Sequence, residues 1–309
     1  MVGSNKIWKQ IVRSEGKDQQ LIDDLRIALV TNPEASKLFV ILEYIKQLTK
    51  EEKSIRILDY GCGSGQLLTY LRILGYDNLT GVDLRSQEAL NQVNIMHNNM
   101  GFGSDIFFTY DGVSLPFDDS SFDIILSQQV LEHVHNVEKY FSESKRVLSS
   151  GGKILLEFPH RLVPFDTHTG MWFVHYFPSI VRDIIYDKYR ENGSERYNKL
   201  LNLHPIWYYK RLLNTMFSFT KDMTGDRIGG FVYRDYYEGN IRIRNMADKL
   251  INSLFFGKNI KKILSIFANS TLISSRRACA SVKNSSRSCA RISSRFSSEF
   301  TLFFSSAIQ

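Results

Sequence analysis

Short apolar runs separated by amphipathic stretches fill residues 55–158, and this alternation constrains the fold more than any other feature. Each run has the length of a β-strand, and the stretch at 137–148 places its apolar side chains on one helical face. The runs are IRILD (55–59), NLTGVD (78–83), DIFFTY (105–110), FDIILS (122–127) and GKILLEF (152–158). Strands that alternate with helices predict an α/β fold, with parallel strands joined by right-handed crossovers and helices on both faces.

Helical periodicity precedes these strands. Leucine and isoleucine recur at helical spacing over residues 18–50, on both sides of Pro33. We therefore expect an N-terminal helical cap over residues 1–50, ahead of the α/β domain.

The pattern after the fifth strand is less regular. It predicts an aromatic loop at 159–178, helices at about 178–191 and 204–216, a strand at 217–220, a basic helical region at 241–268 and a last strand at 271–275. We expect one α/β domain over 51–277, in which residues of about 159–216 and 224–268 shape a substrate site. The Ser- and Arg-rich residues 278–309 have no periodicity, which predicts a disordered tail.

Composition and charge argue against several classes of protein. No stretch approaches the roughly 18–20 apolar residues of a membrane-spanning helix, and the start of the chain has no apolar signal region. The three cysteines show no ligand spacing, so we expect neither a disulfide framework nor a metal site, and we expect a cytoplasmic location. Of the net charge of +7, four basic residues against one acidic residue in the tail carry +3, so we expect no specific nucleic-acid partner.

The sequence ILDYGCGSGQ (57–66) is the most informative segment for function. Gly61, Gly63 and Gly65 alternate after Asp59, where glycine allows a sharp turn and lets a ligand lie against the main chain. A helix starting near Ser64 would direct its N-terminal amides at that ligand. The segment is neither a dinucleotide fingerprint, which requires a small residue at position 66, nor a phosphate loop, which requires Gly-Lys-Ser/Thr.

Polar residues also follow the next three strands. Asp83 closes the second strand, where its carboxylate can accept hydrogen bonds from a ribose diol, and Asp111 follows the third. SQQVLEHV (127–134) brings polar side chains to the end of the fourth strand. Ligands of open α/β sheets bind outside these strand ends, which predicts a nucleoside-binding site there.

These segments together resemble the class I S-adenosylmethionine-dependent methyltransferases. DYGCGSG is similar to the family's glycine-rich first motif, GVD to its ribose-binding acid, YDGVSLPF to its adenine-side loop, FDIILSQQVLEHV to its fourth motif and LSSGGKILLEFPH to the turn into its fifth strand. The resemblance covers about residues 35–225. It implies a doubly wound, seven-stranded Rossmann-like sheet with N-terminal helices and a C-terminal helical insertion, and S-adenosyl-L-methionine as cofactor.

The resemblance also implies a set of cofactor-binding residues. They are Asp59, Gly61, Cys62, Gly63, Gly65, Asp83, Leu84, Asp111, Gly112, Gln128 and Gln129. By this resemblance, the glycine turn faces the methionine end, Asp83 holds the ribose, Asp111 the adenine edge, and the two glutamines lie near the sulfonium.

Transfer of a methyl group to a hydroxyl requires a proton acceptor, and histidine is the natural one. His133, His160 and His168 follow strand ends or lie in the aromatic loop, and are the candidate catalytic residues. No Asn/Asp-Pro-Pro-aromatic tetrad follows the fourth strand and no cysteine lies near it in the sequence, which disfavours methylation of nucleobases. The VLEHV motif resembles small-molecule methyltransferases of quinone, natural-product and surface-sugar pathways, and PFDTHTGMWFVHYFP (164–178) resembles members of surface-polysaccharide biosynthesis. We therefore expect O-methylation of a small-molecule or glycan-type acceptor, as in surface-polysaccharide biosynthesis.

Two alternatives stay open. One is a non-catalytic module that binds S-adenosylmethionine or its demethylated product. The other is a methyltransferase at the inner membrane face that acts on a lipid-linked acceptor, because residues 241–268 interleave basic and apolar side chains as peripheral membrane segments do. The oligomeric state is not predicted.

Overall fold

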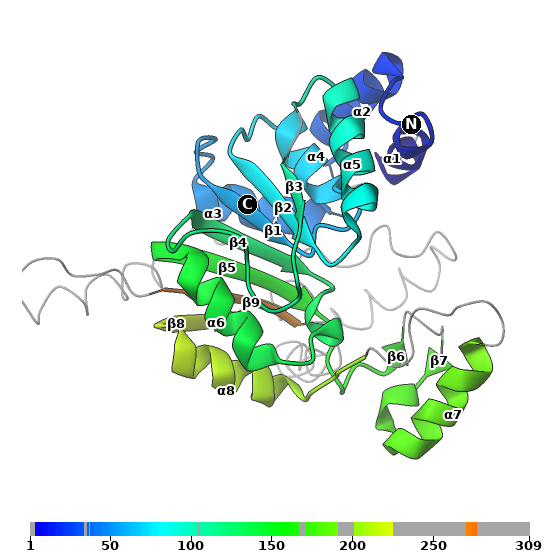
Figure 1. Cartoon of the computed structure of the whole chain (residues 1–309), viewed down its shortest axis with the longest axis vertical. Coiled ribbons are helices and arrows are strands. Elements are labelled where there is room, and N and C mark those ends of the chain that lie inside the picture. Colours follow the sequence, from blue (N-terminus) through cyan, green and yellow to red (C-terminus); the bar gives the residue numbers. More distant parts are fainter. Residues whose placement is uncertain are drawn as a thin grey trace, which may run out of the picture. The chain divides into compact units, whose positions relative to one another are not determined.

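The computed structural model of the chain describes residues 4–33, 36, 38–103, 106–166, 171–190, 201–224 and 270–276. Its main feature is a seven-stranded sheet in the order β3-β2-β1-β4-β5-β9-β8 (Figure 1). The strands are β1 (Ile57–Tyr60), β2 (Leu79–Asp83), β3 (Phe107–Thr109), β4 (Phe122–Gln128), β5 (Leu148–Phe158), β8 (Phe219–Asp222) and β9 (Ser270–Ser275).

Strand direction follows the predicted pattern for the first five strands, which are all parallel. The strand order reverses between β1 and β4, since the chain fills the sheet outward from β1 to β3 and then returns to the other side. β9 is inserted antiparallel between β5 and β8, so it is the reversed strand of a mixed sheet. The doubly wound α/β fold predicted from the sequence is therefore confirmed.

Eight α-helices accompany the strands in the described part of the chain. They are α1 (Ser4–Arg13), α2 (Gln19–Thr31), α3 (Phe39–Thr49), α4 (Gln66–Ile73), α5 (Gln87–Asn99), α6 (Val137–Val147), α7 (Ser179–Arg190) and α8 (Ile206–Met216). Side-chain caps begin three of them: Asp18 accepts from the amides of the first turn of α2, Ser86 from α5 and Asn136 from α6. Such caps satisfy amides that have no partner within the helix.

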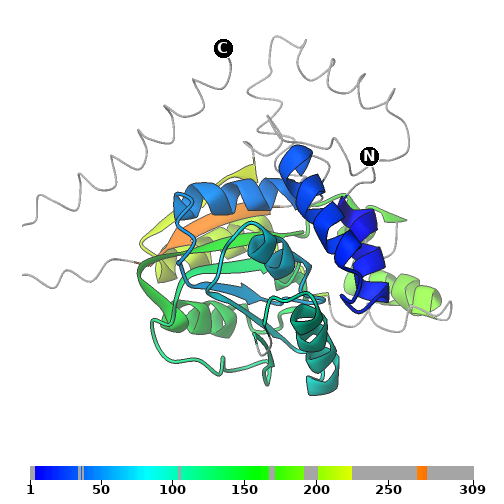
Figure 2. The same cartoon turned by 90° about the horizontal axis from the view of Figure 1, so that it is seen from above.

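Successive side chains of each strand point to opposite faces of the sheet, so the hydrophobic core has a part on each face. Leu58 and Tyr60 of β1 pack in one cluster with residues of α6 and α8, including Phe141 and Leu213. Figure 2 shows α6 on one side of the strands and α3 on the other. Because both faces are covered, the central strands are buried and apolar, as in other parallel sheets.

The segment between β5 and α7 contains more structure than the predicted loop. It forms the short hairpin β6 (Phe165–Asp166) and β7 (Met171–Trp172), followed by the 3-10 turn η3 (Val174–Tyr176). Strands of two residues are too short to produce an alternating pattern, so the sequence could not reveal them. A second 3-10 turn, η2 (Leu131–His133), follows β4.

None of the helices in the described ranges has both the length and the apolar character needed to cross a bilayer. The regions 241–268 and 278–309, which we expected to be a basic helical region and a disordered tail, lie outside the described residues.

Candidate functional site

The predicted cofactor residues gather at one edge of the sheet. Asp59 lies in β1, Asp83 ends β2, Asp111 follows β3 and Gln128 ends β4. Because these four strands are parallel neighbours, their carboxyl ends meet at the same edge. The structure thus brings together residues that lie up to 69 positions apart in the sequence.

Three glycines in the turn between β1 and α4 have positive φ angles, and the space around their Cα atoms differs. A Cβ atom on Gly61 (φ +95°) would lie 2.3 Å from Val130, and one on Gly65 (φ +78°) would lie 2.8 Å from Phe107. At Gly63 (φ +54°) a Cβ atom would meet no other atom within 4 Å. Gly61 and Gly65 are therefore required by packing, whereas Gly63 borders open space in which a ligand can lie against the main chain.

Asp83 joins the end of β2 to this turn. Its Oδ2 accepts a hydrogen bond from the Gly63 amide at 2.7 Å, and its Oδ1 accepts from the Arg85 amide at 3.1 Å. A carboxylate offers about four lone-pair sites, so both oxygens can still accept from a ligand hydroxyl. The carboxylate and the open side of the turn are adjacent, as binding of one nucleoside ligand by both would require.

Leu84 and Gly112 form a second contact between neighbouring loops. Leu84 is exposed, and its Cδ2 would lie 3.1 Å from a Cβ atom on Gly112, which has φ +81°. The loops after β2 and β3 therefore lie side by side, next to Asp83.

Two groups under the turn are buried. Burial, with a further contribution from the charge of Asp83, raises the pKa of Asp59 to about 7. Burial also raises the pKa of the Cys62 thiol well above its usual value, so this cysteine stays protonated and is no nucleophile. Asp59 is a carboxyl group that a nearby cation would help to ionise.

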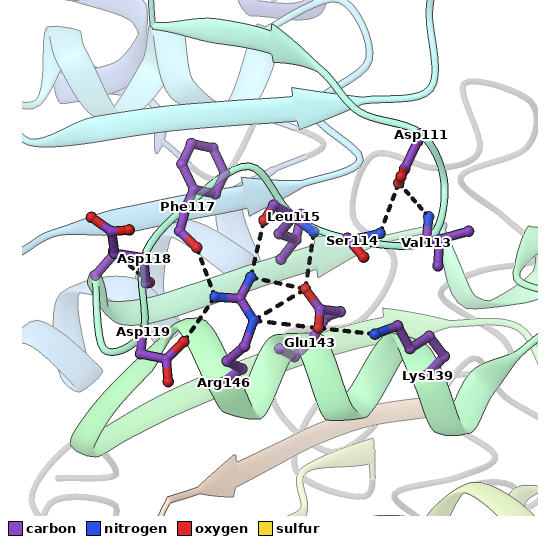
Figure 3. A network of polar contacts seen from close by, with 12 residues as sticks. Asp111, Val113, Ser114, Leu115, Phe117, Asp118, Asp119, Lys139, Glu143 and Arg146 are labelled. Atoms are coloured by element: carbon purple, nitrogen blue, oxygen red, sulfur yellow. Dashed lines mark hydrogen bonds and ion pairs between the residues drawn. The ribbon is translucent and has the colours of Figure 1, made fainter.

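Asp111 is exposed and turned toward its own loop. Its Oδ1 accepts from the amides of Val113 and Ser114 at 2.8 and 2.7 Å (Figure 3), and these hydrogen bonds lower the pKa of the carboxyl group. One oxygen is thus committed to the turn. Only the other is left for the adenine contact predicted from the sequence.

A polar network that the sequence analysis missed holds this loop on α6. The Glu143 carboxylate accepts from the Leu115 amide at 3.0 Å and from Lys139 and Arg146, and Arg146 also donates to the Leu115 and Phe117 carbonyls (Figure 3). The bond with Arg146 is the main cause that lowers the pKa of Glu143 to about 2. The helical i, i+3 and i, i+4 spacing of the three charged residues is the signal that could have revealed it.

The end of β4 faces β5. Gln128 is half-buried, and its amide nitrogen lies 3.4 Å from the buried Glu157 carboxylate, while the exposed Gln129 donates its backbone N–H to the Glu157 carbonyl at 2.7 Å. Glu157 was not identified from the sequence, because a single glutamate in an apolar strand carries no recognisable motif.

The candidate catalytic histidines differ in accessibility. His133 is half-buried in η2, and its amide donates to the carbonyl of Val130, the residue that packs on Gly61. His160 is fully buried, and its Nδ1 accepts from the Leu162 amide at 3.2 Å. His168 lies outside the described residues.

The segment before α8 connects the regions of these two histidines. The Asn202 amide donates to the Glu132 carbonyl, its side chain donates to the Val134 carbonyl, and the Arg161 amide donates to the His204 carbonyl. The residues that follow β4 and those that follow β5 are thereby tied together. Within the described ranges, no group of three or more His, Cys, Asp or Glu side chains is placed to hold a metal ion.

Comparison with known proteins supplies the family. A profile described as "Methyltransferase domain" matches residues 58–156, which run from β1 through β5 and contain the glycine turn, Asp83 and η2. Residues 58–156 are a class I S-adenosylmethionine-dependent methyltransferase domain. The methyl donor of this domain is S-adenosyl-L-methionine, and the open turn at Gly63 beside Asp83 fits such a nucleoside ligand.

Individual relatives match part of the chain. Sterol 4-C-methyltransferase strm-1 of Caenorhabditis elegans is 31% identical over 114 residues, which cover 37% of this chain and 34% of that protein. Malonyl-[acyl-carrier protein] O-methyltransferase of Erwinia billingiae is 33% identical over 100 residues, which cover 32% of this chain and 37% of that protein. The chain spans between about a third and a half of the length of the first curated relatives it matches.

Solved structures include similar chains. Geranyl diphosphate C-methyltransferase from Streptomyces coelicolor A3(2) aligns with a TM-score of 0.47 and 15% identity, over 82% of this chain and 84% of that one.

Proposed function

We propose that the protein transfers a methyl group from S-adenosylmethionine to an oxygen atom of a small-molecule or glycan-type acceptor, as in the synthesis of surface polysaccharides. The observation that carries this proposal is the open turn at Gly63, bonded directly to the Asp83 carboxylate at the carboxyl edge of the sheet. The cofactor supplies an activated methyl group on a sulfonium, and the chain supplies positioning, exclusion of water and a proton acceptor.

The roles of the residues follow from their places. Asp83 binds the ribose, Gly63 and its neighbouring amides face the methionine end, and Asp111 receives the adenine amine with its uncommitted oxygen. His133 accepts the acceptor's hydroxyl proton, because it combines partial exposure with a backbone bond to Val130, beside the glycine turn. His160 is too deeply buried to meet an acceptor directly, so we assign it to positioning the segment after β5.

The methylated atom is a separate question from the family. The relatives named above are a C-methyltransferase and an O-methyltransferase, so the shared domain does not choose the atom. Oxygen is favoured here because a half-buried histidine, whose amide is bonded to Val130 beside the glycine turn, suits removal of a hydroxyl proton.

Labelled cofactor tests the proposal. The protein is incubated with cell extract and S-adenosylmethionine carrying a radioactive methyl group, and glycan, lipid, protein and nucleic acid are then separated. We expect label in the glycan or small-molecule fraction, and none with Gly63→Val, whose β-branched side chain fills the ligand's space and strains a positive φ.

A second measurement separates transfer from binding. If no fraction is labelled but calorimetry still shows binding of S-adenosylhomocysteine, the protein is a non-catalytic binding module. Label in nucleic acid alone would contradict the proposed acceptor class.

A further inference from the structure

Large apolar side chains are exposed in one short stretch after β5. They are Trp172, Phe173, Tyr176, Phe177, Ile180, Val181 and Ile184, and together they are called here the 172–184 patch. Ile180 is 73% exposed, Ile184 65% and Trp172 59%. Single exposed apolar residues are ordinary on protein surfaces, but a contiguous group of this size marks an interaction surface.

The patch is built on a fixed base. Val174 and His175, within the same stretch, are buried, and His175 Nε2 lies 3.8 Å from the buried Asp166 carboxylate. The Phe173 amide donates to the Pro164 carbonyl, and Phe173 adopts φ +61°, which is unfavourable for an aromatic residue. Because these buried residues and the hydrogen bond to Pro164 fix the backbone, the aromatic side chains cannot turn inward without breaking these contacts.

The exposed rings support one another. The ring centroid of Phe173 lies 6.0 Å from Trp172 and 5.8 Å from Tyr176. The next part of the patch belongs to α7, where Ile180, Val181 and Ile184 have the i, i+1, i+4 spacing of one helical face. An aromatic cluster thus leads directly into the apolar face of a helix, and Figure 1 shows α7 next to the β6–β7 hairpin.

The patch is also bonded to the predicted acceptor side of the site. The Tyr176 hydroxyl donates to the Leu162 carbonyl at 2.6 Å, and the Leu162 amide donates to His160 Nδ1. A surface that contacts the patch would therefore lie near the residues that follow β5.

We propose that the 172–184 patch docks the protein onto the surface of an anionic phospholipid bilayer. Tryptophan and tyrosine favour the membrane–water interface, and a helix with one apolar face lies in the plane of that interface. Residues 159–190, which carry the patch, contain four basic and three acidic side chains, a net charge of +1, so the attraction to anionic lipid comes from the +7 of the whole chain, which also opposes the pairing of two identical copies. The docking surface differs from residues 241–268, and it does not depend on the proposed methyl transfer.

Vesicle co-sedimentation of the full chain tests the proposal. One set of vesicles is phosphatidylcholine, and the other is an equal mixture of phosphatidylcholine and phosphatidylglycerol. We expect binding to the mixed vesicles, and a loss of at least about tenfold in affinity for the double variant Ile180→Ser with Ile184→Ser, because two apolar side chains no longer enter the interface.

The matched control changes two residues of α2 whose exposed fractions are similar. Ile27 and Val30 are 57% and 66% exposed, and Ile27→Ser with Val30→Ser should bind vesicles as the parent does. Melting temperature and calorimetric affinity for S-adenosylhomocysteine should be unchanged in both double variants. These two measurements separate a loss of membrane contact from unfolding and from any failure of the proposed function.

Several outcomes would overturn the proposal. The bilayer is excluded if the parent binds neither kind of vesicle, or if the patch variant binds as well as the parent. A parent that is dimeric by light scattering, with a monomeric patch variant, would make the patch a self-association surface. A patch variant that melts several degrees lower, without vesicle binding by the parent, would show that another part of this chain covers the patch.

Discussion

The loops at the carboxyl ends of β1–β3 and the segment that follows β5 are held in different ways. In the loops, carboxylates bind backbone amides: Asp83 binds Gly63, Asp111 binds Val113, and Glu143 of α6 binds Leu115. In the segment after β5, buried residues form a base and large apolar side chains face outward. The loops are thus shaped by directional polar contacts, and the segment presents a non-directional surface.

This difference corresponds to two kinds of recognition. Hydrogen bonds require fixed donors and acceptors, so loops held by carboxylates can recognise one particular cofactor. Apolar contact is roughly proportional to area and tolerates different partners. The cofactor side is therefore expected to respond sharply to single polar substitutions, and the segment after β5 to respond only to loss of apolar area.

Asp59→Asn gives the largest expected effect on the cofactor side. Because the folded pKa of about 7 exceeds the ordinary value of 3.8, the folded state retains a proton that the unfolded chain releases, so stability falls as pH rises from 4 through 7. The asparagine variant escapes this loss, and its free energy of unfolding should exceed the parent's by up to about 4 kcal/mol at pH 8. Urea unfolding at pH 4 and pH 8 measures the difference, which should vanish at pH 4.

The same variant should bind S-adenosylmethionine more weakly, since it cannot provide a negative charge near the cationic cofactor. A variant that is less stable than the parent at pH 8 would mean that Asp59 is held as a carboxylate, which contradicts its raised pKa.

Glu143→Gln tests whether the network in Figure 3 holds the loop after β3, where the adenine contact is predicted. The pKa of Glu143 is lowered from 4.5 to about 2, so its ionised form contributes stability above pH 4.5 that is lost as pH falls toward 2. We expect the free energy of unfolding of the variant to be about 3 kcal/mol lower than the parent's at pH 7, and this difference to shrink below pH 4.5. Thermal unfolding across this pH range measures it.

Asp119→Asn is the control for this network. Asp119 also pairs with Arg146, but its side chain is 75% exposed, so its removal should cost less than about 1 kcal/mol. If Glu143→Gln and Asp119→Asn lower the free energy of unfolding equally, the burial of Glu143 does not strengthen its ion pair with Arg146.

The sheet and the glycine turn could be predicted from sequence because their signals are local. The last strand, expected at 271–275, is Ser270–Ser275 in the structure, and the first five strands lie where the apolar runs predict them. Alternation of glycine and the position of Asp83 at a strand end were equally readable. These features depend on residues that are near one another in the chain.

The rest of the site depends on contacts between distant residues. Val130 fills the space above Gly61, and Glu157 lies opposite Gln128, although each pair is separated by 29 positions or more. The burial of His160 is likewise set by packing, which a residue's neighbours in sequence do not determine. Sequence could therefore name residues that the structure gathers at the carboxyl edge of the sheet, but not which histidine is accessible.

Asp83→Ala should have a smaller effect on stability and a clear effect on binding. The variant loses the bond to the Gly63 amide and the predicted contact with the ribose, and each bond to a charged acceptor is worth about 1.5–3 kcal/mol. Affinity for S-adenosylmethionine and for S-adenosylhomocysteine should fall by similar factors of at least about ten, because the ribose is remote from the methyl group.

Steady-state kinetics sharpen this prediction. The contact exists in both the ground and transition states, so KM for the cofactor should rise while kcat changes much less. Asp83→Glu should be milder, since a longer carboxylate can still reach one hydroxyl. Unchanged cofactor affinity in Asp83→Ala would remove the ribose assignment.

Asp111 is expected to show the smallest effect, because it is exposed and one oxygen already serves its own turn. Asp111→Asn keeps an oxygen for the Val113 and Ser114 amides, whereas Asp111→Ala loses the turn contacts as well. We expect calorimetry to show a loss of about threefold to tenfold in affinity for S-adenosylhomocysteine in Asp111→Ala, and less in Asp111→Asn.

An analogue separates the two roles of Asp111. The analogue of S-adenosylhomocysteine that has hydrogen in place of the 6-amino group has no donor on that edge of the purine for the uncommitted oxygen of Asp111. If Asp111 receives the amine, Asp111→Ala should weaken S-adenosylhomocysteine more than the analogue, because the analogue has no amine contact to lose. If both ligands lose affinity equally, Asp111 acts only through its turn, and recognition of adenine then depends on the loop that Glu143 and Arg146 hold in place.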